Sequence, residues 1–144
     1  MQIITSLRLA LGLVLAVAAC TVALAHDFVV NGIYYERNRD GASATVTYKG
    51  ASYDMYDDEY FGDVTIPSRV TYSGKSYTVR SISDYALAEC TGLRLLTVLN
   101  EVPPTLKFGE STFTSIPSSC VLYVPSHSRA QYRSAYGWRY FSNL

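Results

Sequence analysis

A run of acidic side chains near the middle of the chain is the first candidate for chemistry. Clustered carboxylate oxygens can bind Ca²⁺, and two carboxyl groups about 5 to 9.5 Å apart can hydrolyse a glycosidic bond. The run lacks the spacing and the glycine of a known calcium loop, so we expect a solvated acidic loop without metal or cofactor. A glycan-active enzyme using carboxylates near Asp57 is the weakest functional hypothesis. The acidic residues are Asp54, Asp57, Asp58, Glu59 and Asp63.

Aromatic residues alternate with these acids in the same segment. Tyr53, Tyr56, Tyr60 and Phe61 lie there, in a chain that has 13 Tyr and 5 Phe. Aromatic side chains supply large contact areas in interfaces. We therefore expect these four side chains to contact a protein or glycan partner, with packing over neighbouring strands as the alternative.

The remaining ionisable residues suggest no catalytic machinery. The only histidines, His26 and His127, are far apart in the sequence, and no nucleophile or phosphate-binding motif is present. Lys and Arg together number 12, as do Asp and Glu, so the chain lacks the excess of positive charge that is typical of nucleic-acid-binding proteins. Arg129, Arg133 and Arg139 are expected to form a solvated helix face rather than an anion site. We predict a protein that is not an enzyme.

The first 25 residues have the composition of a secretory signal peptide. Arg8 is the only charge, an apolar run follows from residue 9 to 24, and small residues precede an expected cleavage after Ala25. The segment Val17-Ala18-Ala19-Cys20 also resembles the bacterial lipobox, in which the Cys carries the lipid. The protein is thus expected to be secreted, periplasmic or at the cell surface, with membrane contact only through a lipid on Cys20.

Two other cysteines, Cys90 and Cys120, lie in the chain after this leader. They occupy different positions of the repeat described next, and a disulfide requires Cα atoms within about 7 Å. We expect two buried thiols that pack as small apolar side chains, rather than a bridge.

Mostly apolar positions recur at one offset of 26 residues in the second half of the chain. A period in this range is typical of stacked units that each bury an apolar face against the next, so it predicts a solenoid. The pairs are Ile82 with Phe108, Leu87 with Phe113, Cys90 with Ile116, Leu93 with Ser119, Leu96 with Leu122, and Val98 with Val124.

Three segments, 64–67, 96–99 and 122–125, have apolar first and third residues, which predicts strands with one buried face. Stacked as a ladder, they would project Thr65, Thr97 and Tyr123 from an open face. We expect these three side chains to contact a partner, with an ordinary exposed strand face as the alternative. The segment 70–79 reads as a hairpin that turns at Ser73-Gly74 and lies outside the coil.

The two ends of the chain are expected to cap this ladder. Residues 28–49 alternate like an antiparallel meander, with turn signals at 31–32 and 40–41. Residues 83–89 are expected to form a helical turn with Tyr85, Ala86 and Leu87 inward. A helix capped by Ser126 or Ser128 should run to Tyr136 and stop at Gly137, with Trp138 and Phe141 completing a lid.

The segment 81–93 resembles the repeat of the BspA-like leucine-rich repeat family, whose pattern is I-x-x-x-A-F-x-x-C-x-x-L, with Leu87 in place of the usual Phe. Residues 27–35 and 64–67 resemble the start of secreted members from gut and oral bacteria. Residues 121–125 through 136–138 resemble their end. The resemblance implies a leucine-rich repeat protein with roles in adhesion and host contact, here with barely two repeats.

These observations lead to one expected architecture, an α+β fold that is mostly β. A signal peptide (1–25) precedes an antiparallel β-meander cap (26–63), a minimal leucine-rich-repeat solenoid with a hairpin insertion (64–125) and a C-terminal capping helix with its tail (126–144). The expected function is binding of a protein or glycan partner, possibly host-derived, without catalysis. The alternative is a cell-envelope component that self-associates.

Overall fold

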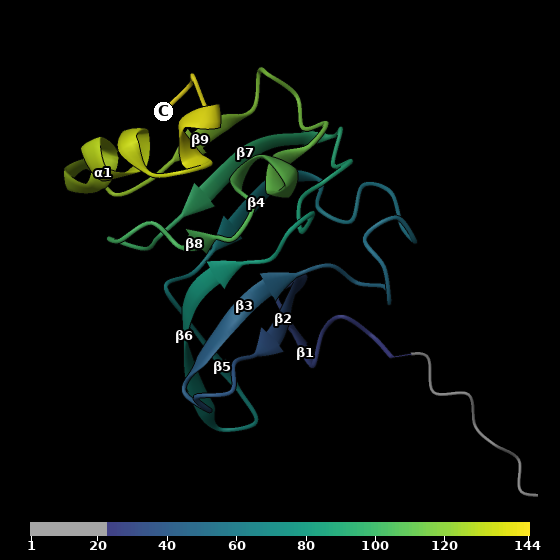
Figure 1. Ribbon diagram of the computed structural model, residues 1–144. Coiled ribbons are helices and arrows are strands. Elements are labelled where there is room, and N and C mark those ends of the chain that lie inside the picture. The colour runs from purple at the N-terminus through teal and green to yellow at the C-terminus, as the bar shows by residue number, and fades with distance from the viewer. Residues whose placement is uncertain (1–22) are drawn as a thin grey trace, which may run out of the picture.

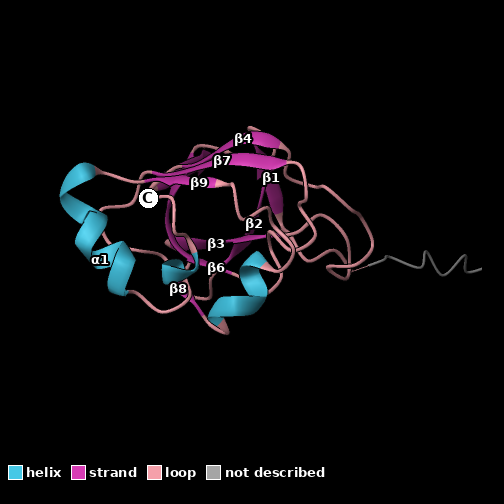
Figure 2. Cartoon of the chain, turned by 90° about the horizontal axis from the view of Figure 1, so that it is seen from above, coloured by secondary structure: helices cyan, strands magenta, loops and turns pink. Residues whose placement is uncertain are grey.

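Two β-sheets face each other across one apolar core in the computed structural model, which describes residues 23–144 apart from the side chain of Glu110 (Figures 1 and 2). The larger sheet has the strand order β1-β2-β3-β6-β5, with β8 also paired to β6, and the smaller has the order β4-β7-β9. The strands are β1 (Phe28–Val30), β2 (Ile33–Arg37), β3 (Ser43–Thr47), β4 (Gly62–Ile66), β5 (Arg69–Tyr72), β6 (Lys75–Ile82), β7 (Leu93–Val98), β8 (Thr105–Leu106) and β9 (Val121–Tyr123). The helical segments are η1 (Gly109–Phe113), η2 (Ser126–Ser128), α1 (Arg129–Ser134) and η3 (Trp138–Tyr140).

The N-terminal strands form where the turn signals predict them. β1 and β2 pair antiparallel around Asn31 and Gly32, whose φ angles of 50° and 77° are those that a tight hairpin turn requires. Before β3, the Asp40 carboxylate accepts hydrogen bonds from the backbone N–H groups of Ala42 and Ser43, both at 2.9 Å. Hydrogen bonds from Ser43 and Ala42 lower the pKa of Asp40 to about 2.

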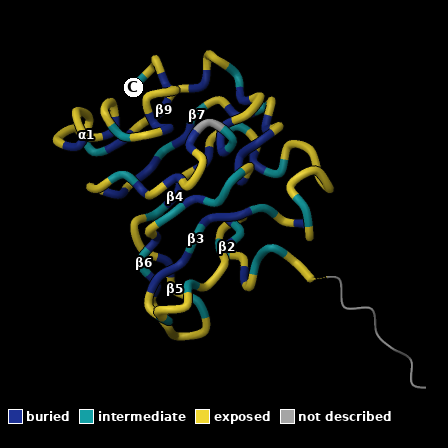
Figure 3. The backbone as a smooth tube through the Cα atoms, viewed as in Figure 1, coloured by how far each residue is buried: buried dark blue, intermediate teal, exposed yellow. Residues whose placement is uncertain are grey.

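The larger sheet curls until its two ends meet. The rings of Phe28 in β1 and Tyr72 in β5 stack with centroids 4.6 Å apart, although these two strands share no ladder of backbone hydrogen bonds in the described chain. The result is a nearly closed, barrel-like sheet that combines antiparallel and parallel pairs. Figure 3 shows that buried positions run almost continuously along β3, whereas buried and exposed positions alternate along β5 and β6.

The hairpin of β5 and β6 turns at Ser73-Gly74, as predicted, but the prediction that it is an insertion on the outside of a coil is wrong. β6 pairs with β3, β5 and β8, and Val70, Tyr77 and Val79 are at most 5% exposed. A sheet of three short strands leaves one apolar face that it cannot cover alone. The apolar face of the hairpin covers it.

The predicted ladder of three strands is present. β4, β7 and β9 are parallel, and Val64, Leu96 and Leu122 lie side by side in successive strands, all at most 8% exposed. The 26-residue offset therefore does describe the pairing of β7 with β9.

The expected solenoid is absent, and the fold class predicted above is wrong. Ile82 pairs with Leu106 rather than sharing a core position with Phe108, which is 58% exposed, and Ser119 is also exposed. The chain does not continue as successive equal turns because β6, which lies between β4 and β7 in the sequence, pairs with the N-terminal strand β3 in the barrel-like sheet and not with the ladder. The first strands are thus part of one sheet with residues 69–82, not a separate meander.

Residues 84–89 form a series of turns rather than a helical turn. Tyr85 and Glu89 have φ angles of 58° and 57°, which interrupt any helix. Leu87 and Ala86 are 1% exposed, as expected, whereas the Tyr85 side chain is 37% exposed instead of turning inward. The backbone N–H of Leu87 donates to the carbonyl of Thr112 at 3.1 Å, which fixes these turns against η1.

The predicted C-terminal helix is present, although it is shorter than predicted and does not cap a solenoid. α1 ends at Ser134, so Tyr136 lies beyond it and is 56% exposed. The Tyr132 hydroxyl donates to the carbonyl of Asn100 and the Trp138 Nε1–H to that of Pro104, both at 2.8 Å. These two bonds fasten the lid to the segment that follows β7.

Candidate functional site

The smaller sheet buries one face and exposes the other. Thr65 of β4 lies beside Thr97 of β7, which lies beside Tyr123 of β9. Since side chains alternate along a strand, this row points away from the buried Val64, Leu96 and Leu122. The open face consists of this row and the preceding one, namely Asp63, Thr65, Leu95, Thr97, Val121 and Tyr123.

The open face combines aromatic, apolar and polar groups. The side chains of Tyr123 and Val121 are 59% and 43% exposed. Adjacent exposed apolar groups of this kind often mark a surface that a partner covers. The Asp63 carboxylate pairs with the guanidinium of Arg94 at 3.0 Å, in an exposed ion pair. The placement of Thr65, Thr97 and Tyr123 on one exposed face agrees with the sequence prediction; their contact with a partner stays a prediction.

Phe61 directly precedes β4 and is the most exposed aromatic side chain of the acidic segment. Its ring covers Gly92, where an added Cβ atom would lie 2.3 Å from the ring carbons, and it remains 72% exposed. The backbone N–H of Gly62 donates to the carbonyl of Gly92 at 3.0 Å. A glycine at position 92 therefore lets Phe61 lie flat on the chain that leads into β7.

The other three aromatic residues of the acidic segment do not join the open face. Tyr53 stacks on Tyr85 with ring centroids 4.1 Å apart, and the ammonium group of Lys49 lies 4.5 Å from the ring centroid of Tyr56. Tyr60 is 2% exposed, so the expectation that it contacts a partner is wrong. Burial raises the pKa of Tyr60 well above its ordinary value.

The neighbouring carboxylates of the acidic segment point to different parts of the chain. Asp58 accepts hydrogen bonds from the Thr91 hydroxyl and the Gly92 N–H, both at 3.1 Å. Glu59 accepts a bond of 3.0 Å from the backbone N–H of Lys49, and burial raises the pKa of this carboxyl. These two carboxyl groups thus stabilise the loop instead of facing each other. Across residues 23–144, no three His, Cys, Asp or Glu side chains are placed to hold a metal.

The remaining polar residues singled out in the sequence lie apart from the open face. Arg129, Arg133 and Arg139 are exposed on α1 and η3, as expected for a solvated face. His127 Nε2 lies 3.6 Å from a carboxylate oxygen of Glu101.

Both cysteines in the described chain are buried free thiols, as predicted. Cys90 is 1% exposed, and burial raises the pKa of its thiol to about 11, so it is a poor nucleophile. Cys120 is 2% exposed and has a pKa raised for the same reason.

The predicted lipidation residue, Cys20, lies outside the described residues. Ala25, the predicted cleavage position, lies within them, and its backbone N–H donates to the carbonyl of Gly50 at 2.9 Å.

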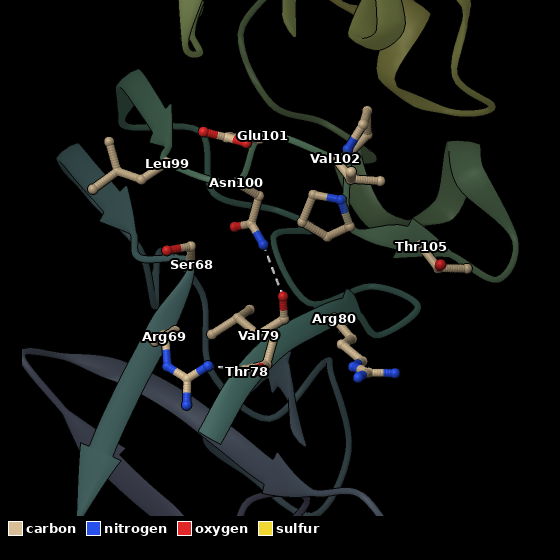
Figure 4. A pocket seen from close by; sticks show the side chains of 12 residues that line it. Ser68, Arg69, Thr78, Val79, Arg80, Leu99, Asn100, Glu101, Val102 and Thr105 are labelled. Atoms are coloured by element: carbon tan, nitrogen blue, oxygen red, sulfur yellow. Dashed lines mark hydrogen bonds between the residues drawn. The ribbon is translucent and has the colours of Figure 1, made fainter. Parts of the chain in front are cut away.

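A cavity that the sequence did not predict lies where β6 changes partners from β5 to β8. β6 pairs with β5 up to Thr78 and with β8 from Ser81 onward, and the segment 99–105 crosses the gap between them. We call this space the junction cavity; its volume is about 560 Å³. Figure 4 shows Arg69 and Arg80 on either side of Val79, with Asn100 above it.

Asn100 is the central side chain of the junction cavity. It is 8% exposed, and its Nδ2 donates to the carbonyl of Val79 at 2.8 Å (Figure 4). Its Oδ1 is buried without a hydrogen-bond partner among the described residues. The only hint in the sequence is an Asn directly after an apolar strand and before Pro103-Pro104, which is too common a pattern to indicate a site.

Comparisons with known proteins add no relative: no family model, no curated protein and no solved structure matches this chain. The resemblance to the BspA-like leucine-rich repeat family therefore stays a prediction. In the described part of the chain, no helix has the length and apolar character needed to cross a membrane.

Proposed function

We propose that this protein is a non-catalytic binding protein that holds a protein or glycan partner against the open face. The observation that carries the proposal is the exposed row Thr65–Thr97–Tyr123, presented by three hydrogen-bonded strands. A sheet face is a rigid platform, so binding there costs little ordering of the backbone. Tyr supplies both apolar contact area and a hydroxyl that can donate or accept.

The size of the open face limits what it can bind. Three strands about 4.8 Å apart form a face only about 10 Å wide between the outer strands, whereas a standard interface covers about 800 Å² on each partner. The contact must therefore extend beyond the strands. Phe61 at one end and Leu99, which follows β7 and is 46% exposed, are placed to extend it.

The leader sequence supports a location outside the cytoplasm for this binding. A signal peptide, or lipidation at Cys20, would place the domain in the medium, the periplasm or at the cell surface. The resemblance to secreted leucine-rich repeat proteins of gut and oral bacteria points the same way and suggests adhesion to host material. These assignments are part of the proposal.

A binding experiment with two single variants tests the proposal. The mature protein is presented to immobilised extracellular-matrix proteins and mucin glycans, alongside Tyr123→Ser on the open face and Phe108→Ser, which removes an equally exposed aromatic side chain elsewhere (58% against 59%). A bound component should lose about tenfold or more in affinity with Tyr123→Ser and little with Phe108→Ser. Equal losses, or no bound component at micromolar concentration, would contradict the proposal.

A second candidate is self-association as a cell-envelope component, favoured by the position of β4. In the described chain β4 ends the smaller sheet, with β7 on one side and no paired strand on the other. An unpaired edge can accept a strand from another copy. Light scattering after gel filtration decides this: a strict monomer at about millimolar concentration, the range in which weak association appears, removes the candidate.

A further inference from the structure

A row of short hydroxyl side chains crosses the outer face of the larger sheet. β3, β6 and β8 lie parallel there, with Thr45 beside Ser81 and Ser81 beside Thr105. The residues that follow these three in each strand face the core and are at most 5% exposed: Val46, Ile82 and Leu106. Since side chains alternate along a strand, the hydroxyl row points away from the core.

The three residues of this row line a cavity of about 230 Å³, which we call the hydroxyl recess. Its lining also contains Ile82 and three polar residues that follow β6 and β8: Ser83, Asp84 and Lys107. All six polar residues of the lining are partly or fully exposed, so a ligand can reach them. Pockets for drug-sized ligands have roughly 300 to 1,000 Å³, so the recess holds a smaller ligand.

A directed chain of hydrogen bonds determines what Ser81 offers to a ligand. The Asp40 carboxylate accepts from the Ser43 hydroxyl at 2.7 Å, and that hydroxyl accepts from Asn38 Nδ2 at 2.7 Å. Asn38 Oδ1 in turn accepts from the Thr45 hydroxyl at 2.7 Å. Because a hydroxyl has a single proton, Ser81 is the donor in its 2.6 Å contact with Thr45. Ser81 Oγ therefore presents only lone pairs to the recess and accepts hydrogen bonds from a ligand.

Asp84 and Lys107 supply the charges of the recess. Asp84 Oδ1 accepts a hydrogen bond of 3.2 Å from the backbone N–H of Phe108, which places the carboxylate beside the residue that follows Lys107. Asp84 Oδ2 accepts none from a described residue. The Lys107 ammonium lies 5.2 Å from the Phe108 ring centroid and forms no ion pair with a described residue. One carboxylate and one ammonium balance, so the recess favours a neutral ligand that both donates and accepts hydrogen bonds.

The recess also offers carbon atoms for contact. Thr45 and Thr105 carry methyl groups, and the Lys107 stem consists of methylene groups. Side chains of this kind pack their carbon atoms against a neighbour while their polar ends make hydrogen bonds. A sugar ring matches this combination, because it has hydroxyl groups around its rim and C–H groups on its faces. A small volume and a balanced charge favour a sugar over a peptide or an anion.

We infer that the hydroxyl recess binds one neutral sugar residue of a glycan. One hydroxyl of a vicinal pair donates to Asp84 Oδ2, and the neighbouring hydroxyl accepts from the Lys107 ammonium. A third hydroxyl donates to Ser81 Oγ. The recess lies on the larger sheet and the open face on the smaller one, so this site exists whether or not the open face binds a partner.

Chemical-shift titration of the mature protein with small sugars tests the inference. The probes are the methyl glycosides of galactose, glucose and mannose, which present vicinal hydroxyl groups in three different arrangements. Tetrahydropyran-4-ol has a ring of the same size with a single hydroxyl, and methyl glucuronide adds a carboxylate. We expect at least one glycoside to bind with a Kd of about 1 to 10 mM and to shift the backbone amides of Asp84, Thr105 and Lys107.

The comparison ligands decide the chemistry of the site. Tetrahydropyran-4-ol should bind at least about tenfold more weakly than the best glycoside, because it cannot bond to both charged groups. Methyl glucuronide should bind no more tightly than methyl glucoside, because its carboxylate gains nothing in a recess of balanced charge. No shift of the three amides with any glycoside at about 50 mM overturns the inference. Equal binding of tetrahydropyran-4-ol, or tighter binding of the glucuronide, overturns the assignment to a neutral sugar.

Isosteric variants provide the matched control. Asp84→Asn keeps the oxygen that bonds to the Phe108 N–H but replaces Oδ2 with a donor, so it should weaken binding of the best glycoside at least about tenfold. Lys107→Met keeps the stem without the ammonium and should weaken binding about fivefold. Asp57→Asn, in the exposed acidic segment, makes the same charge change as Asp84→Asn and should leave the affinity unchanged. Equal effects of the two Asn variants would contradict the site. Tyr123→Ser should not alter this titration, so the inference and the proposed function fail independently.

Discussion

Replacing Tyr60 with Phe removes one buried oxygen atom that joins two strands. The Tyr60 hydroxyl donates to the carbonyl of Thr47 at 2.6 Å and accepts from the N–H of Tyr34 at 3.2 Å. Tyr34 and Thr47 are partners in the β2–β3 register, so the hydroxyl lies in the ladder between them. Tyr60→Phe keeps the buried ring and deletes only this bridge.

The magnitude follows from the two groups left behind. The Thr47 carbonyl is buried, Thr47 being 2% exposed, and an unpaired buried acceptor costs about 1 to 3 kcal/mol. The N–H of Tyr34 is partly buried, and direct pairing with Thr47 after a small strand movement recovers part of the loss. We expect Tyr60→Phe to lower the free energy of unfolding by about 2 kcal/mol.

Urea denaturation followed by the fluorescence of the single Trp, Trp138, measures this change. Tyr56→Phe is the matched control, because that side chain is 43% exposed and its hydroxyl makes no hydrogen bond to a described residue; it should change stability by less than about 0.5 kcal/mol. If Tyr60→Phe also changes stability by less than about 0.5 kcal/mol, the buried hydrogen-bonded bridge is not present. Tyr60 would then be an exposed aromatic residue, as the sequence predicted.

Three further predictions address the turns, the lid and the buried ionisable groups. Gly32→Ala should lower the free energy of unfolding, measured by thermal denaturation, by about 1 kcal/mol. The φ of 77° is the only cause, because no atom lies within 4 Å of the added methyl group. An unchanged free energy of unfolding would mean that the turn relaxes. Trp138→Phe should cost about 1 to 3 kcal/mol in urea denaturation followed by circular dichroism, since the Pro104 carbonyl loses its donor; an unchanged midpoint would contradict the fastened lid. Burial raises the pKa of Cys90 to about 11 and also raises the pKa of Tyr132. The free energy of unfolding should therefore be highest below pH 9 and fall as the pH rises toward 11, because the unfolded chain loses these protons first. Cys90→Ala should flatten the first part of that fall in urea midpoints measured from pH 7 to 11.

The local features of the fold were predictable because short-range chemistry specifies them. Asn31-Gly32 and Ser73-Gly74 adopt the positive φ angles that few other residue pairs tolerate, so they form hairpins wherever they lie. The alternation in 64–66 and 121–123 likewise selects strands with one buried face. The exposure of Thr65 and Tyr123 follows from that alternation.

The repeat period misled where it was extended beyond the ladder. It pairs Ile82 with Phe108, yet the chain uses Leu106 in that place and leaves Phe108 exposed. A repeat period in the sequence identifies structurally equivalent positions only where each repeat packs against the next one. Here β6 contacts β3 instead, because the N-terminal strands and the hairpin had apolar faces of their own to cover.

The sequence by itself determined the turns, the strands of the smaller sheet and the residues that project from it, since each depends on neighbours within a few positions. Only the tertiary structure decided that Tyr60 is internal while Phe61 is exposed, and that Asn100 meets Arg69 and Arg80 in one cavity. These outcomes depend on contacts between segments 20 to 30 residues apart, such as Asn100 with Val79 and Tyr60 with Tyr34. Local preference carries no information about such contacts, because they are selected by which apolar faces must cover one another.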